Sequence, residues 1–433
     1  MSAAVAATEQ YLARIDRDNA TLHAFITVDH SGALKAARAA DERRARGAAL
    51  SPIDGLPIAI KDNIDVAGLP TTNGAEHWRN NIAATDAFVT ARLREAGAVI
   101  LGKLNMHEAA LGATNDNPWY GRCQNPRRLG YVPGGSSGGS GAAVAANLCA
   151  AALGSDTLGS VRIPAAYCGV AGFKPTFGAI STRGVMPLAW TLDTVGVLAP
   201  RVADLLPVLA AAKAFDRGWP YARRGPRLIE MKHARNPHDL RGTKIGRPSH
   251  LERVEIEPEV MAAYEQALAG LAARGATVET VDFADFDYSK VRREGLLLCE
   301  IEGSVSLGDA IAANPDGFSV ELRSVLAYGA KQSAVRAAQM YKRLADTRAI
   351  GRRTFAQIDA LVLPAAPQVA FRHGTPAPAN QADLSSFASI LGVPAGCVPF
   401  GQGRDGLPAS IQVVASAFED ALVLDLLAAV ETL

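Results

Sequence analysis

The sequence lacks an excess of charge of either sign. Lys plus Arg total 44 and Asp plus Glu total 43 among 433 residues, which leaves a formal net charge of +1. Without a surplus of positive charge, the chain as a whole has no field that would attract nucleic acid or an anionic membrane. The composition therefore predicts no nucleic-acid partner and no membrane partner.

Cysteine is scarce and is not arranged as a disulfide framework or a zinc site. The chain has five cysteines, an odd number, with no CxxC pair and no His grouping at zinc spacing. They are Cys123, Cys149, Cys168, Cys299 and Cys397. We expect reduced thiols, as in a cytosolic protein, and no metal site.

Long hydrophobic runs are also missing. The N-terminus reaches acidic residues early and has no basic start followed by an apolar core, so it is not typical of a secretory signal. The apolar run from Ala142 to Leu153 is too short to span a bilayer. These features predict a cytoplasmic protein.

The chain has the material for a large core. Hydrophobic residues make up 48% of it and charged residues 20%, the balance of an ordinary globular protein. At this length two or three domains are common. We favour a single large α/β unit over residues 1–433, built around one broad sheet.

Four stretches follow one another along the chain. Residues 1–50 form a helical entry with a short extended piece, and residues 51–200 alternate strand and helix patterns. Residues 213–242 are rich in Arg, Pro and Gly without a period, which predicts an exposed excursion. Residues 243–433 return to an α/β pattern, with helices predicted over about 295–357.

Two glycine-rich turns carry the chemical signal. The run Gly134 to Gly141 leads into an Ala-rich helix predicted over 142–153, and a second glycine-punctuated turn follows at Gly154 to Gly169. A Gly/Ser tract is often a flexible linker, but a linker explains neither the helix nor the second turn. A phosphate-binding loop is a third possibility, but the Lys-Ser/Thr ending of a P-loop and the GxGxxG spacing are absent.

Serines in these turns can act as nucleophiles only with a base. Ser136 and Ser160 are brought close if the two turns lie side by side at one end of a sheet, and no histidine is near them in sequence. Lys61 ends a predicted strand, and a lysine among apolar neighbours can lose its proton near neutral pH. An exposed lysine and ordinary turn serines are the alternative interpretation of each residue alone.

The motifs together resemble the amidase-signature family. They are IAIKDN, PGGSSGGSGAAVAA, GSDTLGSVRIPAAYCGVAGFKPTFG and TLDTVG, in that order, between about Leu22 and Gly196. The resemblance implies a Ser–cis-Ser–Lys triad. By position, Ser160 matches the nucleophile, Ser136 matches the serine that follows a cis peptide bond after Gly135, and Lys61 matches the lysine.

The resemblance also implies how the reaction is supported. The backbone N–H groups of the turn would form the oxyanion hole, and they belong to Thr157, Leu158, Gly159 and Ser160. Leu158 departs from the family pattern, which more often has glycine there, and this puts substrate choice in doubt. Ser137 is expected to fix its loop. Asp156 and Arg162 are expected to form an ion pair that holds the turn, with a helix cap at Asp156 as the alternative.

The implied fold is one α/β/α unit around a large mixed twisted sheet, with no cofactor, no metal and often a homodimer. Three functions stay open. The first is a free amidase that acts on a small carboxamide or urea-like substrate, which the wording TRGVMPLAWTLDT at 182–194 favours. The second is the glutamine-hydrolysing subunit of a tRNA-dependent amidotransferase. The third is a non-catalytic scaffold, which has no need of an intact Lys61, Ser136 and Ser160.

Overall fold

A computed structural model describes residues 3–225 and 236–433 of the chain. Part of the predicted excursion, residues 226–235, therefore lies outside the described residues. In the described residues an 11-stranded mixed sheet has the order β1-β3-β2-β6-β8-β7-β12-β13-β11-β9-β10, and β4 and β5 form a separate two-stranded ribbon. The expected α/β/α architecture around a mixed sheet is confirmed.

The strands are short, and six of them, β2, β3, β6, β7, β8 and β11, are buried along their whole length. Their bounds are β1 (Phe25–Val28), β2 (Pro57–Lys61), β3 (Val99–Leu104), β4 (Asp116–Asn117), β5 (Gly121–Arg122), β6 (Ala151–Asp156), β7 (Ala171–Lys174), β8 (Thr194–Ala199), β9 (Lys244–Pro248), β10 (Thr277–Val281), β11 (Ala360–Pro364), β12 (Ala395–Gln402) and β13 (Pro408–Ala415).

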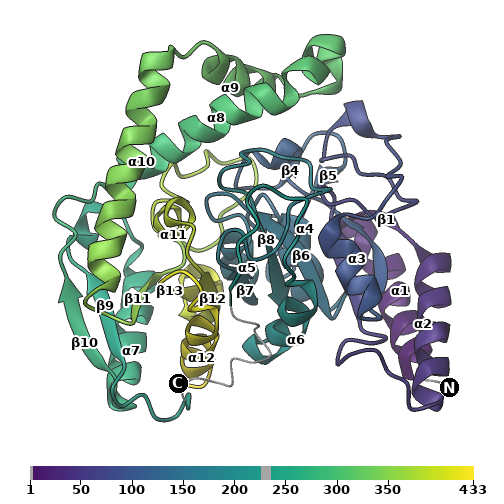
Figure 1. The fold of residues 1–433 in the computed structure, drawn as a ribbon, viewed down its shortest axis with the longest axis horizontal. Helices are drawn as coiled ribbons and strands as arrows, with labels where there is room; N and C mark the ends of the chain where they lie inside the picture. Colours follow the sequence, from purple (N-terminus) through teal and green to yellow (C-terminus); the bar gives the residue numbers. More distant parts are fainter. Residues whose placement is uncertain (1–2, 226–235) are drawn as a thin grey trace.

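Helices cover both faces of the sheet (Figure 1). Their bounds are α1 (Ala3–Leu22), α2 (His30–Ala45), α3 (Phe88–Glu95), α4 (Gly138–Ala145), α5 (Arg162–Cys168), α6 (Val202–Ala212), α7 (Pro258–Ala273), α8 (Tyr288–Ala313), α9 (Val320–Ala330), α10 (Ala334–Phe355), α11 (Ser386–Leu391) and α12 (Asp420–Glu431). No helix in this part of the chain is long and apolar enough to cross a membrane.

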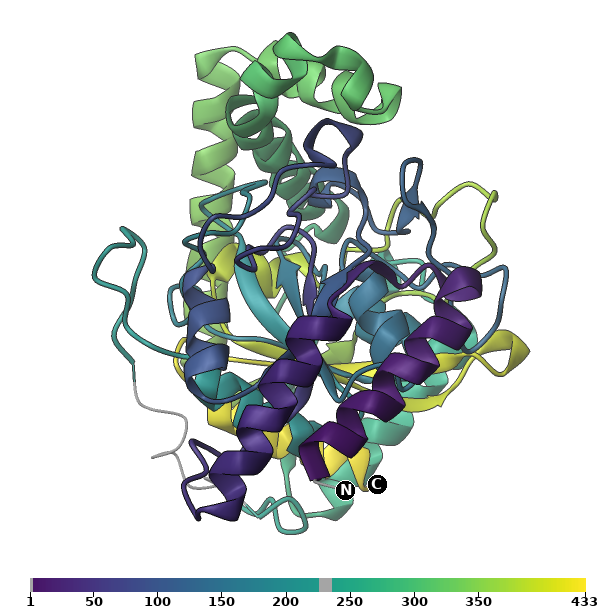
Figure 2. The same cartoon turned by 90° about the vertical axis from the view of Figure 1, so that its right-hand side faces the viewer.

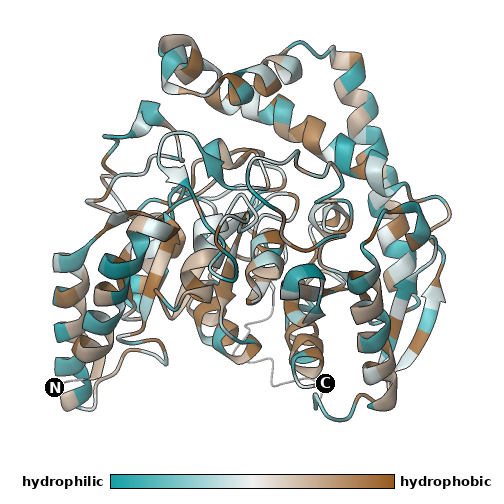
Figure 3. Ribbon diagram, turned by 180° about the vertical axis from the view of Figure 1, so that it is seen from behind, coloured by the Kyte–Doolittle hydropathy of each residue, from teal (hydrophilic) through white to brown (hydrophobic). Residues whose placement is uncertain are grey.

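Two large clusters of buried apolar side chains hold the layers together. One lies between the sheet and α3, α6 and α12, and the other lies between the sheet and α1, α2, α4 and α5. Figure 2 shows α1 and α2 side by side across one face, and Figure 3 shows hydrophobic residues concentrated in the strands and on the inner sides of the helices. Burial of this apolar surface is the main force that fixes the strand order.

The helices α8, α9 and α10 extend beyond the layers and lie at the top of Figure 1. They confirm the predicted helical region, although the first of them begins at Tyr288, earlier than expected. The helix α8 contacts α9, α10 and α11. Gly295 of α8 lies close to the side chain of Leu158, which follows β6 in the second glycine-rich turn.

The Ala-rich stretch after the first glycine run differs from the prediction. A helix was expected over 142–153, but α4 begins at Gly138 and ends at Ala145, and Ala151 to Leu153 belong to the strand β6. Asn147 adopts a left-handed conformation with φ of 55°, which ends the helix and reverses the chain. These residues form a strand because their backbone pairs with both β2 and β8 inside the sheet.

Candidate active site

Lys61 ends the interior strand β2 and is completely buried. Its Nζ lies 2.7 Å from Ser136 Oγ and 2.8 Å from Ser155 Oγ. Burial lowers the pKa of Lys61 to about 7, although the negative charges of Asp193 and Asp156 act in the opposite direction. A substantial fraction of this lysine is therefore neutral near pH 7 and able to accept a proton.

Ser136 lies in the first glycine-rich turn, and the Gly135–Ser136 peptide bond is cis. The Ser136 carbonyl accepts a hydrogen bond of 3.0 Å from the backbone N–H of His107. Gly135 allows close contact with the loop at 112–114, because a Cβ at this position would lie 2.9 Å from three backbone atoms there. The turn is thus held by backbone contacts on both sides of the cis bond.

Ser160 lies in the second glycine-rich turn, just before α5. The two turns meet as the sequence predicts: Ser137 N–H donates to the Ser160 carbonyl at 3.2 Å, and Ser137 Oγ donates to the Ser155 carbonyl at 3.1 Å. Within the described residues, the Ser160 hydroxyl makes no hydrogen bond of its own. It faces a cavity instead.

Asp156 and Arg162 form a completely buried ion pair, with Arg162 Nη2 at 2.9 Å and Nε at 3.0 Å from the Asp156 carboxylate oxygens. The same carboxylate accepts from Gly159 N–H at 2.8 Å and Val161 N–H at 3.2 Å. Burial by itself raises the pKa of Asp156, but the adjacent Arg162 guanidinium outweighs it and holds that pKa below its usual value. The turn therefore closes around a permanent negative charge.

This geometry separates the four N–H groups that the motifs assigned to an oxyanion hole. The Gly159 N–H already donates to Asp156. Gly159 is required for another reason, because its φ is 135° and a Cβ there would lie 2.3 Å from Ser385 Oγ. Asp156 accepts no hydrogen bond from the N–H groups of Thr157, Leu158 and Ser160 within the described residues, so these three remain as candidate donors of the turn.

Several residues of the site were not found by sequence reasoning. Asn63 Nδ2 donates to Ser155 Oγ at 3.1 Å, so both residues belong to the surroundings of Lys61. Thr157 Oγ1 donates to Asp193 at 2.6 Å, and the N–H groups of Leu188 and Ala189 donate to the other oxygen of that carboxylate. The sequence contained one indication of these residues, which was their position. The quoted motifs include Asn63, Ser155 and Asp193, although the motifs were interpreted through their other residues.

Asp193 is a buried acidic residue that contacts the second glycine-rich turn through Thr157. Burial raises its pKa to about 6, and the hydrogen bond from Thr157 partly offsets that effect. Its two oxygens join the strand end after Asp156 to the loop before β8. This carboxylate therefore fixes Thr157, one of the candidate oxyanion donors.

Residues from the C-terminal part of the chain complete the support of the turn. Arg162 Nη1 donates to Gln412 Oε1 at 2.5 Å and to the Ser385 carbonyl at 2.9 Å, and Nη2 donates to Ser389 Oγ at 2.8 Å. These contacts join residues more than 220 positions apart in the chain. Local sequence patterns carry no information on such pairs.

A cavity of about 200 Å³ opens beside Ser160. Most of its wall is apolar, and it is lined by Ala110, Leu111, Gly112, Ala113, Gly135, Thr157, Leu158, Ser160, Ile163, Leu188, Arg292, Leu296, Cys299, Ala379, Gln381 and Ala382. Leu158 is part of this wall, and its side chain packs closely over Gly295 of α8. The described parts of the 213–242 excursion contribute nothing to this wall.

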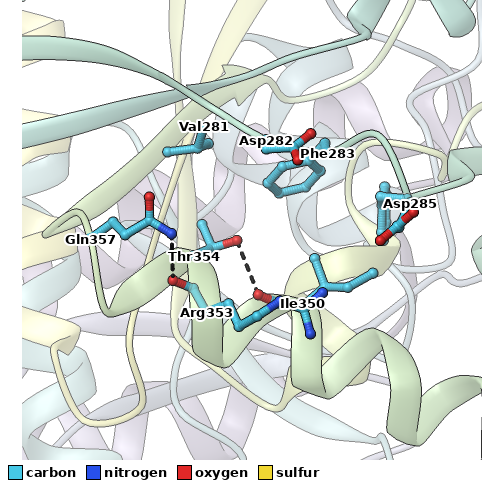
Figure 4. Close-up of a pocket in the computed structure, with 9 residues that line it drawn as sticks. Val281, Asp282, Phe283, Asp285, Ile350, Arg353, Thr354 and Gln357 are labelled. Atoms are coloured by element: carbon cyan, nitrogen blue, oxygen red, sulfur yellow. Dashed lines mark hydrogen bonds between the residues drawn. The ribbon is translucent and has the colours of Figure 1, made fainter.

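A second cavity, of about 410 Å³, lies between the end of β10 and the last turns of α10 (Figure 4). Two polar side chains in its wall are bonded within the helix: Thr354 Oγ1 donates to the Ile350 carbonyl and Gln357 Nε2 donates to the Arg353 carbonyl. The cavity is larger than the one beside Ser160, but none of its residues comes from the lysine–serine constellation. Chemistry, and not size, identifies the candidate site.

The cysteines take no part in this constellation. All five are free and buried. Cys168 Sγ contacts the Pro133 carbonyl at 3.3 Å, and burial raises the pKa of its thiol. A thiol held in its protonated form is a poor nucleophile.

The sheet, the buried lysine and the paired serine turns are features of an amide hydrolase of the amidase-signature type. The family model described as Amidase matches residues 6–424, and the chain belongs to this family. The resemblance found in the motifs is therefore confirmed, and with it the general class of hydrolase.

Curated relatives and solved structures cover nearly the whole chain. A glutamyl-tRNA(Gln) amidotransferase subunit, from Thermosynechococcus vestitus, is 34% identical over 96% of this chain and 91% of its own length. A solved structure described as an unexpected vestigial protein complex that reveals the evolutionary origins of an s-triazine catabolic enzyme has a TM-score of 0.92, with 32% identity over 100% of this chain and 95% of that one. The peptide amidase of Stenotrophomonas maltophilia has a TM-score of 0.86, with 29% identity over 99% and 93%.

These relatives overturn one expectation. The sequence predicted a small-molecule amide as the partner, with a homodimer left open, and neither nucleic acid nor a membrane. The prediction of no nucleic acid, and of no partner beyond a small molecule and a possible second copy, is wrong, because the curated relatives are named as one subunit of a glutamyl-tRNA(Gln) amidotransferase. The expectation of no membrane partner stays a prediction. The net charge of a single chain does not reveal a nucleic acid whose contacts are shared among the chains of a complex.

Proposed function

We propose that the chain cleaves a C–N amide bond through an acyl-enzyme on Ser160. The observation that carries this proposal is the completely buried Lys61, with a pKa of about 7, at 2.7 Å from Ser136 Oγ. A neutral lysine in this position takes the proton of Ser136, and Ser136 in turn takes the proton of Ser160. The Ser160 oxygen then attacks the amide carbon.

The remaining steps use the same groups in reverse order. The carbonyl oxygen of the tetrahedral intermediate gains negative charge, which N–H donors among Thr157, Leu158 and Ser160 stabilise. The C–N bond breaks as Ser136 returns its proton to the leaving nitrogen, which departs as ammonia or an amine. Water then attacks the acyl-enzyme by the same relay and releases the carboxylic acid.

The contacts of Lys61 orient its lone pair. Asn63 donates to Ser155 Oγ, so a lone pair of this oxygen remains to accept an N–H from Lys61. With one N–H directed to Ser155, the lone pair of the neutral amine is free to face Ser136. Asn63 and Ser155 act as positioning residues in this proposal, and they do not touch the substrate.

The supporting residues hold the two turns in register. Gly135 permits the close approach of the first turn, and Ser137 bonds that turn to Ser155 and Ser160. Asp156 and Arg162 close the second turn from inside the protein. None of these four is proposed to react.

We propose further that the chain is the amide-hydrolysing subunit of a tRNA-dependent amidotransferase complex, with glutamine as the source of ammonia. The support is the set of curated relatives of that name, which match this chain over 90% or more of their own length at 32–36% identity. The wording at 182–194 favours a free amidase instead, but it covers 13 residues only. A similarity that extends over the whole chain outweighs it.

A free amidase is the second candidate. The peptide amidase with a TM-score of 0.86 supports it, and so does the largely apolar wall of the cavity. A scaffold without activity is disfavoured because Lys61, Ser136 and Ser155 form a connected buried set that packing alone does not require.

One structural unit over residues 1–433 also stays a proposal. Its support is that the cavity wall combines residues from 110–113, 157–163, 292–299 and 379–382, so that no single stretch encloses it. A limited proteolysis experiment tests it. For a single unit, proteolysis should leave no stable fragment. Thermal or denaturant unfolding of the chain should show one cooperative transition.

The first test of function compares the wild type with Ser160→Ala. Ammonia or amine release is measured from glutamine, from small carboxamides and ureas and from peptide amides, and intact mass is used to detect the acyl-enzyme. Release that requires Ser160 supports the mechanism. Equal release by the Ser160→Ala variant contradicts it.

The second test separates the two candidates. Glutamine hydrolysis is measured for the isolated chain and again after the chain is copurified with its natural partners and supplied with glutamylated tRNA. Hydrolysis that rises with partners and tRNA supports the amidotransferase. Full turnover of a simple amide by the isolated chain, without any response to tRNA, supports the free amidase.

A further inference from the structure

The cavity between β10 and α10 has an apolar floor and a charged rim (Figure 4). Its volume of about 410 Å³ lies within the range of roughly 300–1,000 Å³ that is typical of small-molecule sites. The floor consists of Val281, Phe283, Phe286 and Ile350, of which the first three are buried. A ligand in this cavity therefore meets two aromatic rings with its apolar part.

Three charged side chains line the same cavity from two sides. Asp282 and Asp285 follow the end of β10, and Arg353 belongs to the last turns of α10. Figure 4 shows the aspartates on the strand side of the cavity and Arg353 on the helix side. Charges on a protein surface are usually solvated one by one, but these three belong to the wall of one cavity.

The charges on the two sides do not neutralise each other. Within the described residues, the side chains of Arg353 and Asp285 make neither an ion pair nor a hydrogen bond. Asp282 Oδ1 accepts the N–H of Ala284 at 2.8 Å, and its Oδ2 makes no hydrogen bond in the same part of the chain. Opposite charges that line one cavity without contact suit a ligand that carries a charge of each sign.

The lining disfavours other classes of ligand. In the described residues, no group of three or more His, Cys, Asp or Glu side chains could hold a metal ion. Two carboxylates repel a phosphate group, which disfavours a nucleotide or a phosphorylated metabolite. A simple amine leaves Arg353 without a partner, and a simple carboxylic acid leaves Asp282 and Asp285 without one.

We infer that this cavity binds a free amino acid with a large apolar side chain, such as leucine or phenylalanine. Its ammonium group lies at Asp282 and Asp285, and its carboxylate accepts the terminal N–H groups of Arg353, whose planar fork matches a carboxylate. The apolar side chain packs on Phe283 and Phe286. This cavity shares no lining residue with the cavity of the candidate active site, so the inference does not depend on the proposed function.

The floor of the cavity contacts the elements that support the active site. The ring centroids of Phe283 and Phe286 lie 5.3 and 5.2 Å from that of Phe387 in α11. On the same helix, Ser389 Oγ accepts a hydrogen bond from Arg162, which closes the second glycine-rich turn. The amino acid therefore lies against side chains that contact α11, although it does not enter the substrate cavity.

Calorimetric titration of the chain with L-leucine and three analogues tests the ligand class. Isoamylamine is leucine without the carboxylate, and isocaproate is leucine without the ammonium group. Glycine has both charges but no apolar side chain. Thermal unfolding with and without each compound gives a second measurement, because a ligand that binds only the folded chain raises its Tm.

The expected result is saturable binding of leucine at one site per chain. Isoamylamine and isocaproate should each bind about 10-fold more weakly or worse, the usual effect of losing charge-assisted hydrogen bonds. Glycine should bind more weakly still than leucine, because it buries no apolar side chain.

Substitutions assign the binding to this cavity. Arg353→Gln and Asp285→Asn should each weaken leucine binding by about 10-fold, and Arg353→Gln should also remove the preference for leucine over isoamylamine. Arg352→Gln and Glu279→Gln are the matched controls, because these neighbouring charges are exposed and do not line the cavity. All four positions are on the surface, where such changes affect stability little, and thermal unfolding without ligand checks this.

Three outcomes overturn the inference. The first is the absence of saturable binding of leucine and phenylalanine up to their solubility limits. The second is binding of isoamylamine or isocaproate as tight as that of leucine. The third is leucine binding that Arg353→Gln leaves unchanged, or that Arg352→Gln weakens to the same extent, since such binding belongs to another part of the molecule.

Discussion

Two buried lysines lie at or next to the ends of the neighbouring parallel strands β2 and β3, and their surroundings differ. Lys61 and Lys103 are both completely buried, and Ile60 is paired in register with Lys103. Lys103 Nζ lies 3.0 Å from the Asp62 carboxylate and donates to the Pro70 carbonyl and Thr71 Oγ1. Among the residues that the structure describes, Lys61 has two serine hydroxyls and no carboxylate as hydrogen-bond partners.

The difference shows that burial alone does not make a lysine a base. A carboxylate beside a buried ammonium stabilises its charge, so Lys103 has a structural task. Hydroxyl partners satisfy hydrogen bonds but supply no counter-charge, and the pKa of Lys61 falls to about 7 as a result of burial. The three consecutive residues Lys61, Asp62 and Asn63 thus have three different surroundings. Lys61, the proposed base, contacts Ser136, Asp62 is paired with Lys103, and Asn63 donates to Ser155.

The largest expected effect comes from removing the base. Lys61→Met keeps a similar volume and deletes the amine, so amide turnover should fall by about 10²- to 10⁴-fold, the usual contribution of a general base. The fold should be kept or become more stable, because a buried lysine without a carboxylate partner is replaced by an apolar side chain. Steady-state kinetics and denaturant unfolding measure the two quantities. Unchanged turnover in a folded Lys61→Met protein would remove Lys61 from the mechanism.

The same substitution at Lys103 should have the opposite effect, with a loss of stability as the main result. Lys103→Met leaves Asp62 buried without its cation, so the free energy of unfolding should fall by about 3–5 kcal/mol. Lys103→Met combined with Asp62→Leu should recover part of this loss, since the uncompensated charge is gone. Urea unfolding of the three proteins provides the measurement. A Lys103→Met protein as stable as the wild type would mean that the ion pair is not what stabilises this strand end.

The pH dependence sharpens the comparison further. Because Lys61 accepts a proton only in its neutral form, kcat/KM should rise about tenfold per pH unit below pH 7 and level off above it, in line with the Lys61 pKa of about 7. The sign for stability is the same: the folded-state pKa is below that of an unfolded lysine, so the contribution of this group to stability rises with pH above 7. A pH profile on a neutral amide measures the first effect. A flat profile from pH 5 to 9 is incompatible with lysine as the base.

The smallest effect is expected for Ser155, the second serine whose hydroxyl contacts Lys61. Ser155→Ala removes one acceptor of Lys61, so turnover should fall by roughly 10-fold, within the effect of one or two hydrogen bonds. The loss of an acceptor disfavours the charged amine, so the midpoint of the pH profile should move to lower pH. Asn63→Ala should reproduce the loss of rate in a weaker form. A drop in rate without any movement of the midpoint would indicate that Ser155 serves packing only.

Motifs made much of this site predictable. The residues Lys61, Ser136 and Ser160 lie at strand ends and in glycine-rich turns, whose signatures are local and therefore visible in one dimension. The strand that was predicted to end at Lys61 is β2, and the predicted alternation of strand and helix over 51–200 begins with β2, α3 and β3. Short-range periodicity is sufficient for such elements.

The predictions failed where the structure or function of a segment depends on something outside that segment. Residues 151–153 have the sequence pattern of the end of an Ala-rich helix, but they form hydrogen bonds with β2 and β8 and belong to the sheet. The partner prediction failed for a related reason, since composition describes one chain and the names of its relatives describe an assembly. The cytoplasmic location stays a prediction.

The sequence by itself determined the family, the general fold and the identity of the candidate lysine and serines, because these depend on contiguous motifs. Only the tertiary structure decided that Lys103 and not Lys61 has a carboxylate beside it, that the Gly159 N–H is already occupied by Asp156, and that Arg292 lines the cavity. Each of these depends on contacts between strands, turns and helices that are far apart in the chain. Partners in space set the charge of a buried group, and spacing along the sequence does not reveal them.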